Sequence, residues 1–351
     1  MHKKITVATL ALLTVASLAL AGCSSAGAST SNAAATSTDG AQCGPLTTMT
    51  SATVATNPGN QDLVIKTVKS QGLDTKYNLN LDVKSFLNPP ASAQAITQGA
   101  VDFGFGGLTT MDQARAGGSD VVFIGALSVP TAGVFVPKGS SIKSLSDLKG
   151  KRVGSFTALN GATTAVLQAL AKKAYGVDLL TDLDGQVHVA PDAELYGLMD
   201  QGQLDAIVLD AAGTAYQVNA GNYTELVDLT ADYNAKLGYS PLYLGPVTTD
   251  SYAQQNCSAV RAYNSALRDA VQYILSNSSV WTDYAASLGQ PEAAASFQKL
   301  YTSSFVTTWT QTEIDAMKKL IKDLLPYLDP SFPQDIPDSL FTLNYPPLPS
   351  Q

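Results

Sequence analysis

Four short segments combine glycine and other small residues with hydroxyl, amide or carboxyl groups, which is the chemistry that holds a polar solute by hydrogen bonds. They are Asn57-Pro58-Gly59-Asn60, Gly106-Gly107-Leu108-Thr109-Thr110, residues 155–164 and Asp210-Ala211-Ala212-Gly213. Each follows an expected strand and leads into an expected helix, where free backbone N–H groups attract acceptors and anions. The same residue types are favoured at turns and N-caps regardless of function. As a group, the segments predict a cleft for a small ligand.

The candidate ligand contacts come from these segments and from two apolar stretches that join the halves of the protein. They are Asn57, Gly59, Asn60, Gly107, Leu108, Thr109, Ser128, Ser155, Phe156, Asn160, Gly161, Thr163, Asp210, Tyr239 and Tyr243. Helix N-termini and hydroxyls would suit an anion. The two tyrosines, with Phe156 and Asp210, would instead suit a neutral or cationic heteroaromatic solute, or the tyrosines could simply pack at a hinge. No arginine lies at an evident cleft position, so a bidentate clamp for a carboxylate is not expected.

The N-terminal segment has the parts of an export signal. Lys3 and Lys4 precede an apolar run, Ile5 to Ala21, that ends in Leu-Ala-Gly-Cys at Cys23. The run is short for a membrane span and is diluted by hydroxyl residues. The last four residues resemble the bacterial lipobox, which implies cleavage after residue 22 and a lipid anchor (palmitate included) on Cys23 that ties the protein to the membrane. The alternative is an ordinary signal peptide with a chance cysteine.

Residues 23–45 are expected to form a flexible tether, because small and polar residues dominate them. Loss of the two signal-peptide lysines takes the formal charge from -8 to -10, and an acidic chain argues against nucleic-acid binding. Cys43 and Cys257 remain as a pair that either forms a disulfide in an exported protein or stays as two free thiols. His188 is the only histidine beyond the signal, so no metal site, cofactor or histidine-dependent triad is expected.

The elements that must position the cleft alternate between strands and helices, which indicates α/β architecture with largely parallel sheets. The first series has strands at 50–54, 79–86, 101–105 and 121–127, with helices at 62–70, 91–99 and 109–116. The second has strands at 152–156, 187–190 and 204–209, with helices at 161–175, 193–201 and 211–220. Residues 128–137 and 239–249 are expected as strands that cross between the two series. Helices at 251–275, 280–288, 291–301 and 310–324 and a proline-rich tail follow.

An internal repeat supports two similar lobes. Residues 96–105 and 199–208 share a Gln-Gly-x-x-Asp core, placed between the end of an expected helix and the start of an expected strand. The shared glycine suits the position just after a helix.

Residues 142–154, Ile-Lys-Ser-Leu-Ser-Asp-Leu-Lys-Gly-Lys-Arg-Val-Gly, resemble the segment that opens the second lobe of type II solute-binding proteins of ABC importers. The repeat, the lipobox and the two crossovers match that family, and the element order resembles its nitrate, sulfonate, taurine and thiamine-precursor branch. The resemblance implies a two-lobed Venus-flytrap fold, with a first lobe at 46–128 and 248–351 and a second at 129–247. It also implies a monomeric, lipid-anchored, extracytoplasmic protein that passes a sulfonate, nitrate or thiamine-precursor-like solute to a membrane permease.

Two other functions remain open from the sequence. A tethered sensor would present the solute to a receptor instead of a permease. A pyrimidine synthase of the same fold would need an active-site histidine and a cysteine-rich motif, and the chain has no matching cysteine cluster. We therefore expect a binding protein and not an enzyme.

Overall fold

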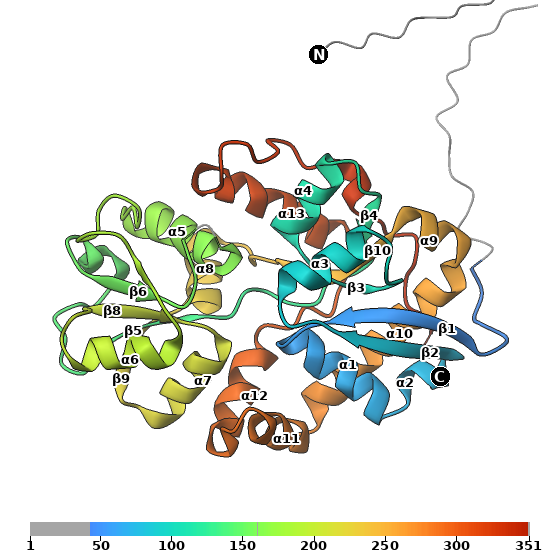
Figure 1. Ribbon diagram of the computed structural model, residues 1–351, viewed down its shortest axis with the longest axis horizontal. Helices are drawn as coiled ribbons and strands as arrows, with labels where there is room; N and C mark the ends of the chain where they lie inside the picture. The colour runs from blue at the N-terminus through green and yellow to red at the C-terminus, as the bar shows by residue number, and fades with distance from the viewer. Residues whose placement is uncertain (1–42, 160, 350–351) are drawn as a thin grey trace, which may run out of the picture. The chain divides into compact units, whose positions relative to one another are not determined.

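The strands of the protein separate into two groups that define two lobes (Figure 1). The computed structural model describes residues 43–159 and 161–349. We call residues 43–128 and 244–349 lobe 1, and residues 129–243 lobe 2. The expected export signal, the lipidation site Cys23, most of the expected tether and the candidate contact Asn160 lie outside the described residues.

Lobe 1 holds two small sheets. Its strands are β1 (Thr50–Thr56), β2 (Leu79–Ser85), β3 (Gly104–Gly107), β4 (Val121–Phe123) and β10 (Leu244–Thr249). β1 and β2 pair in parallel, and β10 lies between β3 and β4, antiparallel to both. A parallel bridge between Val54 and Phe103 brings β1 next to the start of β3. The order along the lobe is therefore β2, β1, β3, β10, β4.

Lobe 2 repeats this arrangement in one five-stranded sheet. Its strands are β5 (Gly133–Pro137), β6 (Val153–Ser155), β7 (His188–Val189), β8 (Ala206–Leu209) and β9 (Tyr223–Asp228). Their order is β7-β6-β8-β5-β9, with β5 antiparallel to β8 and β9. Each lobe thus contains one antiparallel strand, β10 in lobe 1 and β5 in lobe 2. In both cases it is the first strand after the chain crosses from the other lobe.

Helices cover both sets of strands. Those before β10 are α1 (Asn60–Ser70), α2 (Leu73–Lys76), α3 (Pro89–Thr97), α4 (Leu108–Ala116), α5 (Ala162–Tyr175), α6 (Asp192–Asp200), α7 (Ala211–Ala220) and α8 (Leu229–Leu237), with a 3₁₀ turn η1 (Leu145–Leu148). Those after β10 are α9 (Asp250–Gln255), α10 (Cys257–Ser276), α11 (Ser279–Ser287), α12 (Ala294–Thr302) and α13 (Gln311–Leu324), with 3₁₀ turns η2 (Pro291–Ala293), η3 (Leu325–Tyr327) and η4 (Asp338–Leu340). Within the described residues, no helix is both long and apolar enough to cross a membrane.

The repeated Gln-Gly-x-x-Asp motif has the same structural role in each lobe. Gly99 and Gly202 follow α3 and α6 with positive φ angles of 65° and 67°, a conformation that glycine adopts without steric penalty. The carboxylate of Asp102 accepts the backbone N–H of Thr53 in β1, at 2.7 Å. The carboxylate of Asp205 likewise accepts the backbone N–H of Arg152, just before β6, at 2.9 Å. The motif therefore ties the start of β3 to β1 in lobe 1 and the start of β8 to the start of β6 in lobe 2.

The two crossovers are shorter as strands than the sequence predicts. β5 begins at Gly133 instead of residue 128, and β10 begins at Leu244 instead of residue 239. Pro130 and Pro241 explain the difference, because proline has no N–H to donate to a sheet. A single antiparallel bridge, Ser128 to Leu244, joins the two connecting segments.

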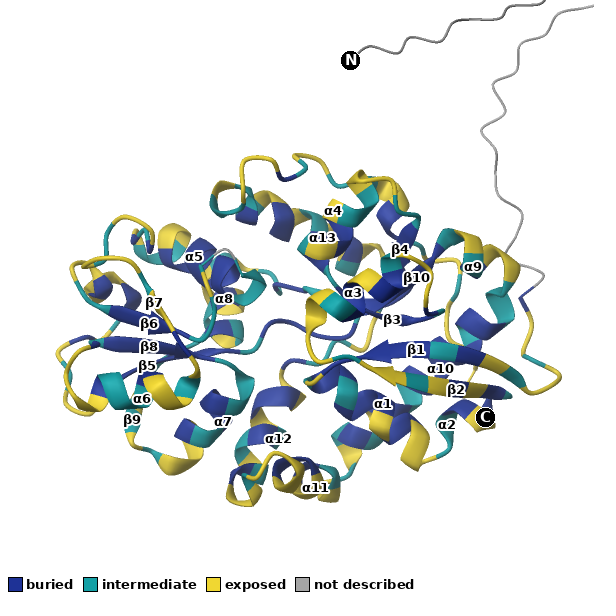
Figure 2. Cartoon of the chain, viewed as in Figure 1, coloured by how far each residue is buried: buried dark blue, intermediate teal, exposed yellow. Residues whose placement is uncertain are grey.

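The C-terminal helices contact both lobes. α10 packs on α1 and α2, as expected for a return to lobe 1. α12 lies beside α7, and α13 contacts both α4 and α5 (Figure 1). The central strands β3, β10, β5, β6 and β8 are mostly buried, whereas most residues of β2, β7 and β9 are exposed or half-buried (Figure 2). Phe103 stacks on Tyr263 of α10 with ring centroids 4.2 Å apart.

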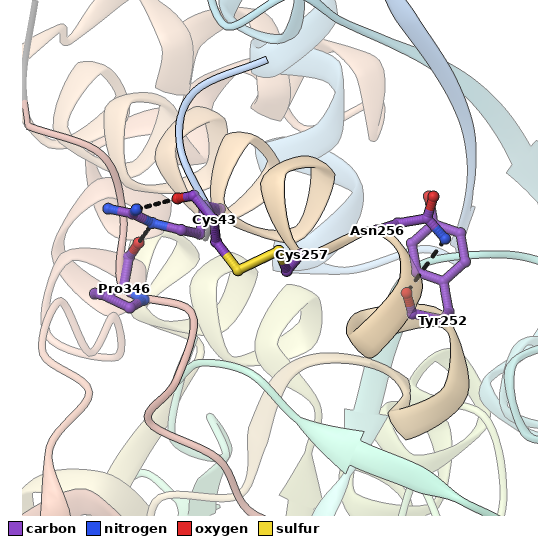
Figure 3. Close-up of a disulfide and its surroundings, with 6 residues drawn as sticks. Cys43, Tyr252, Asn256, Cys257 and Pro346 are labelled. Carbon is purple, nitrogen blue, oxygen red and sulfur yellow. Dashed lines mark hydrogen bonds between the residues drawn. A yellow bond between two sulfur atoms is a disulfide. The ribbon is translucent and has the colours of Figure 1, made fainter. Parts of the chain in front are cut away.

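A disulfide joins Cys43 to Cys257 at the start of α10 (Figure 3). The two residues are 214 positions apart in the sequence, so the bridge closes a loop that contains all of lobe 2 and the five strands of lobe 1. The guanidinium of Arg261, one turn further along α10, donates to the carbonyls of Cys43 and Pro346. The start of the described chain and its C-terminal tail are thereby fixed to the same helix.

Candidate functional site

The first candidate loop is fastened to the connection between the lobes. The side-chain amide of Asn60, the first residue of α1, donates to the hydroxyl of Ser128 at 2.7 Å. Both residues are buried, with 8% and 2% of their surface exposed. Ser128 also exchanges backbone hydrogen bonds with Leu244 on the second connection, at 3.1 and 3.0 Å. Asn60 and Ser128 therefore hold the hinge region together.

The second candidate loop packs on a tyrosine of the second connection. The hydroxyls of Thr109 and Tyr243 lie 2.7 Å apart, and the N–H of Leu108 donates to the carbonyl of Tyr243 at 2.8 Å. A Cβ atom at Gly107 would lie 2.7 Å from the Tyr243 ring, so only glycine leaves room for this contact. Burial raises the pKa of Tyr243 to about 12, which keeps its hydroxyl protonated.

The third candidate loop, between β6 and α5, is held by its own residues. Thr164 donates to the carbonyl of Gly161 at 2.9 Å, and Gln168 donates to the carbonyl of Leu159 at 2.6 Å. Ser155 is fully buried, and Thr163 is half-buried at the start of α5. In the same loop, Phe156 borders a cavity.

That cavity, of about 840 Å³, lies between lobe 2 and the turn that joins α11 to η2 in lobe 1. Its lining in lobe 2 comes from Phe156, Val189, Ala190, Pro191, Asp192, Ala193, Tyr196, Asp210, Ala212, Gly213 and Tyr216. Its lining in lobe 1 comes from Leu288, Gly289, Gln290 and Glu292. Three of these residues carry carboxyl groups, and none is a lysine, arginine or histidine.

Two aspartates at the starts of adjacent helices give the cavity its charge. Asp210 is the N-cap of α7, and its Oδ1 accepts the N–H of Gly213 at 2.8 Å. Asp192 begins α6 and lies close enough to hydrogen-bond with Asp210. Burial, and secondarily the charge of Asp210, raises the pKa of Asp192 to about 7. When the site is empty at neutral pH, the carboxyl group of Asp192 is therefore protonated in a large fraction of molecules.

Of the sequence-predicted contacts, Phe156, Asp210 and the glycine-containing turn after Asp210 border this cavity. Tyr239 has a different environment: its hydroxyl donates to Asp323 of α13 at 2.7 Å, and Lys319 lies 3.8 Å from its ring centroid. These contacts match the alternative of packing at the hinge. Asn57 and Gly59 lie in lobe 1 at the start of α1, where Asn57 is buried and donates to the carbonyl of Pro58.

Sequence reasoning missed Asp192, Tyr196 and Tyr216. The sequence places the start of α6 at residue 193, one residue after Asp192, so the N-terminal position of this acid was overlooked. An acid directly after Pro191 at a helix start was the available signal, because acids are favoured in the first turn of a helix. Among the described residues, no cluster of His, Cys, Asp and Glu has the arrangement of a metal site.

A second cavity, of about 300 Å³, lies in lobe 1 between α10 and the C-terminal tail. Arg268 is its only charged lining residue. The guanidinium of Arg268 already donates to Tyr77, to Asp269 and to the carbonyl of Leu348. This cavity is surrounded by one lobe alone, so the interlobe cavity is the better candidate for ligand-dependent closure.

Comparison with known proteins shows which family this chain matches. The model of a family described as NMT1/THI5 like matches residues 68–279. A protein of Brucella abortus described as a binding protein is 33% identical over 84 residues, which cover 24% of this chain and 25% of that protein. The chain thus matches about a quarter of the length of its curated relatives.

Solved structures with the same fold include two sulfonate-binding proteins. The alkanesulfonate-binding protein SsuA from Xanthomonas axonopodis pv. citri, bound to MOPS, matches with a TM-score of 0.63 and 17% identity, over 83% of this chain and 98% of that one. The periplasmic aliphatic sulphonate-binding protein SsuA from Escherichia coli matches with a TM-score of 0.65 and 18% identity, over 86% and 93%. At these identities the likeness concerns the fold, which is the two-lobed fold of periplasmic binding proteins.

Proposed function

Because the chain belongs to the NMT1/THI5-like family, we propose that it is the extracytoplasmic solute-binding subunit of an ABC importer. It captures a small organic solute between its lobes and delivers it to a permease in the membrane. The observation that carries this proposal is the cavity of about 840 Å³ whose lining comes from both lobes. A ligand that contacts both sides favours the closed arrangement of the lobes over the open one.

The connections between the lobes fit such a motion. Between Ser128 and Gly133, and between Tyr239 and Leu244, the chain runs outside regular strands. Backbone rotation in such short irregular segments is the usual basis of hinge closure. The buried pair of Asn60 and Ser128 and the pair of Thr109 and Tyr243 lie beside these segments. These loops therefore support the hinge and the wall of the cleft, and the direct contacts to the solute come chiefly from the acidic cavity.

A binding role without catalysis agrees with the composition of the cavity. Its described lining contains no serine, threonine, cysteine, lysine or histidine, the side chains that most often act as nucleophiles. His188, the sequence candidate for an active-site histidine, does not line this cavity; it is exposed and lies 3.3 Å from Glu194.

The lipid anchor belongs to the same proposal. A tethered subunit stays near its permease, and the lipobox at residues 20–23 supplies the acceptor cysteine. We expect Cys23→Ser to release the protein from the membrane fraction or to leave an uncleaved precursor, because the acyl-bearing thioether cannot form. Fractionation of cells and the mass of the mature chain measure this. A Cys23→Ser protein that is still membrane-bound at the mature mass would exclude lipid anchoring.

The function itself is tested by binding and closure together. Native mass spectrometry of the full chain, purified from the cells that make it and then exposed to a panel of small organic solutes, identifies any that bind. X-ray scattering with and without that solute then measures closure, and we expect a smaller radius of gyration in the complex. Absence of any bound solute from the panel, or binding without a change in scattering, would contradict the proposed function.

A further inference from the structure

We infer that the solute is a small organic cation, such as an amidinium or ammonium compound with a flat or apolar body, whose charged nitrogen lies between Asp192 and Asp210. This inference rests on the proposed function and adds the charge class of its ligand. A cationic ligand differs from the anions named for the two sulfonate-binding structures. The evidence for this difference is the set of side chains that line the cavity.

Asp192 and Asp210 both line the cavity, and the protein does not use all of their acceptor capacity. Oδ1 of Asp210 accepts the N–H of Gly213, and the Asp210 carboxylate is close enough to hydrogen-bond with the protonated carboxyl group of Asp192. Oδ1 of Asp192 is buried and has no hydrogen-bond partner among the described residues. A buried acceptor without a donor is unfavourable, because its lost hydration is not replaced by a hydrogen bond. A ligand N–H group would satisfy it.

A missing side chain makes room for this pair. A Cβ atom at position 213 would lie 1.7 Å from Oδ2 of Asp192, so any side chain at this position would force the Asp192 carboxylate to move. Gly213 lies inside α7, where glycine is less favourable for the helix than alanine. The glycine therefore lets the Asp192 carboxylate approach α7 and Asp210.

The electrostatic balance of the cavity favours a cation. Asp192, Asp210 and Glu292 line it, and no basic residue does. A buried carboxylate needs a compensating charge or a proton. In the empty site a proton held by Asp192 supplies that compensation, as its raised pKa of about 7 indicates. A ligand cation can replace the proton, whereas a sulfonate would add a further negative group to a cavity lined by three carboxyl groups.

The remaining lining suits the body of such a ligand. Phe156, Tyr196 and Tyr216 supply aromatic surface, and the rings of Tyr196 and Tyr216 have centroids 6.1 Å apart. Cations bind favourably over aromatic faces. Gln217, next to Tyr216 and against Tyr196, is 2% exposed, and its side-chain oxygen has no partner among the described residues.

Groups on the facing elements do not reverse this charge balance. Glu292 lines the cavity from η2. Tyr284 of α11 and Tyr301 of α12 are close enough to Asp210 for its charge to raise their pKa values. Asp62 of α1 also acts on Tyr284. Burial raises the pKa of both tyrosines, so their hydroxyls stay neutral. The other two groups, Glu292 and Asp62, are acids, so none of these groups favours an anionic ligand.

The test uses two probes of matched shape and opposite charge, benzamidinium and benzenesulfonate, titrated by calorimetry into the full chain at pH 8. We expect benzamidinium to bind and benzenesulfonate not to bind. Asp192→Asn and Asp210→Asn should each weaken benzamidinium binding by roughly 10- to 100-fold, the usual effect of removing a hydrogen bond to a charged group. Glu194→Gln, on the same helix but with an exposed carboxylate, should leave it unchanged.

Equal or tighter binding of benzenesulfonate would overturn the inference of a cationic ligand, but it would still agree with the proposed solute-binding function. Binding of neither probe, or undiminished benzamidinium binding by both asparagine variants, would also overturn the inference, while solute screening and scattering still decide the proposed function. The comparison of probes on the unaltered chain does not depend on the folding of any variant.

Discussion

Asp192→Asn should make the empty protein more stable at alkaline pH while it removes ligand affinity. The pKa of Asp192 is raised from 3.8 to about 7, first by burial and then by Asp210. A carboxyl group whose pKa is higher in the folded state binds more protons there, so the free energy of unfolding falls as the pH rises between those two values. Asparagine fits the same space and cannot ionise, so this decrease in the free energy of unfolding with rising pH does not occur in the variant.

The size of the effect follows from the same pKa change. One pKa unit corresponds to about 1.4 kcal/mol, so the full change gives an upper bound of about 4 kcal/mol at pH 8. Asp192 is only partly buried and shares its environment with Asp210, so solvent screening reduces this to about 1–2 kcal/mol. A buried Asp112, whose pKa burial raises to about 6, adds a similar pH dependence that the variant retains.

Urea denaturation of the ligand-free chain in buffers from pH 4 to pH 8 measures this prediction, with Glu194→Gln as the matched control. The variant and the unaltered chain should have nearly the same free energy of unfolding at pH 4. They should separate as the pH rises, with the Asp192→Asn variant more stable by about 1–2 kcal/mol at pH 8. Parallel curves at all pH values, or a variant that is less stable at pH 8, would refute the assignment of a partly protonated carboxyl pair.

Three further predictions test other parts of the structure. Reduction of the Cys43–Cys257 bridge, which spans 214 positions, should lower the free energy of unfolding by at most about 4–5 kcal/mol; an unchanged thermal melt would show that the bridge does not constrain the unfolded chain. Gly213→Ala should push Asp192 out of place and weaken benzamidinium binding at least tenfold with helix content intact by circular dichroism, and unaltered affinity would contradict the packing of Asp192 on α7. Asp323→Asn removes an ion pair and weakens a hydrogen bond between α13 and lobe 2, so urea denaturation should show a loss of about 1–2 kcal/mol, and no loss would mean that these contacts are solvent-screened.

The two-lobed fold was predictable because its signals are local and repeated. The Gln-Gly-x-x-Asp copies mark equivalent turns, and their glycines and aspartates have equivalent contacts in both lobes. Strand β9 and helix α8 were not predicted. The Tyr-Thr-Glu-Leu-Val-Asp of β9 lies at the edge of its sheet with both charged and apolar residues exposed or half-buried, so it lacks a clear alternation.

The candidate site was predictable only in part. Two residues selected near helix N-termini, Phe156 and Asp210, border the cavity. The sequence could not show that the hydroxyls of Thr109 and Tyr243 hydrogen-bond to each other. The two residues are 134 positions apart, and only the tertiary structure brings them together. Asp192 was missed for a related reason: its role depends on the space left by Gly213 on a neighbouring helix.

The most direct test of the central claim is a crystal structure of the full chain with the solute identified by mass spectrometry. We expect the solute in the cavity between the lobes, with one face against Asp210 and Phe156 and the other against the turn at residues 288–292. A solute bound in the lobe 1 cavity beside α10, or one that contacts lobe 2 alone, would contradict the account of a ligand held between two closing lobes.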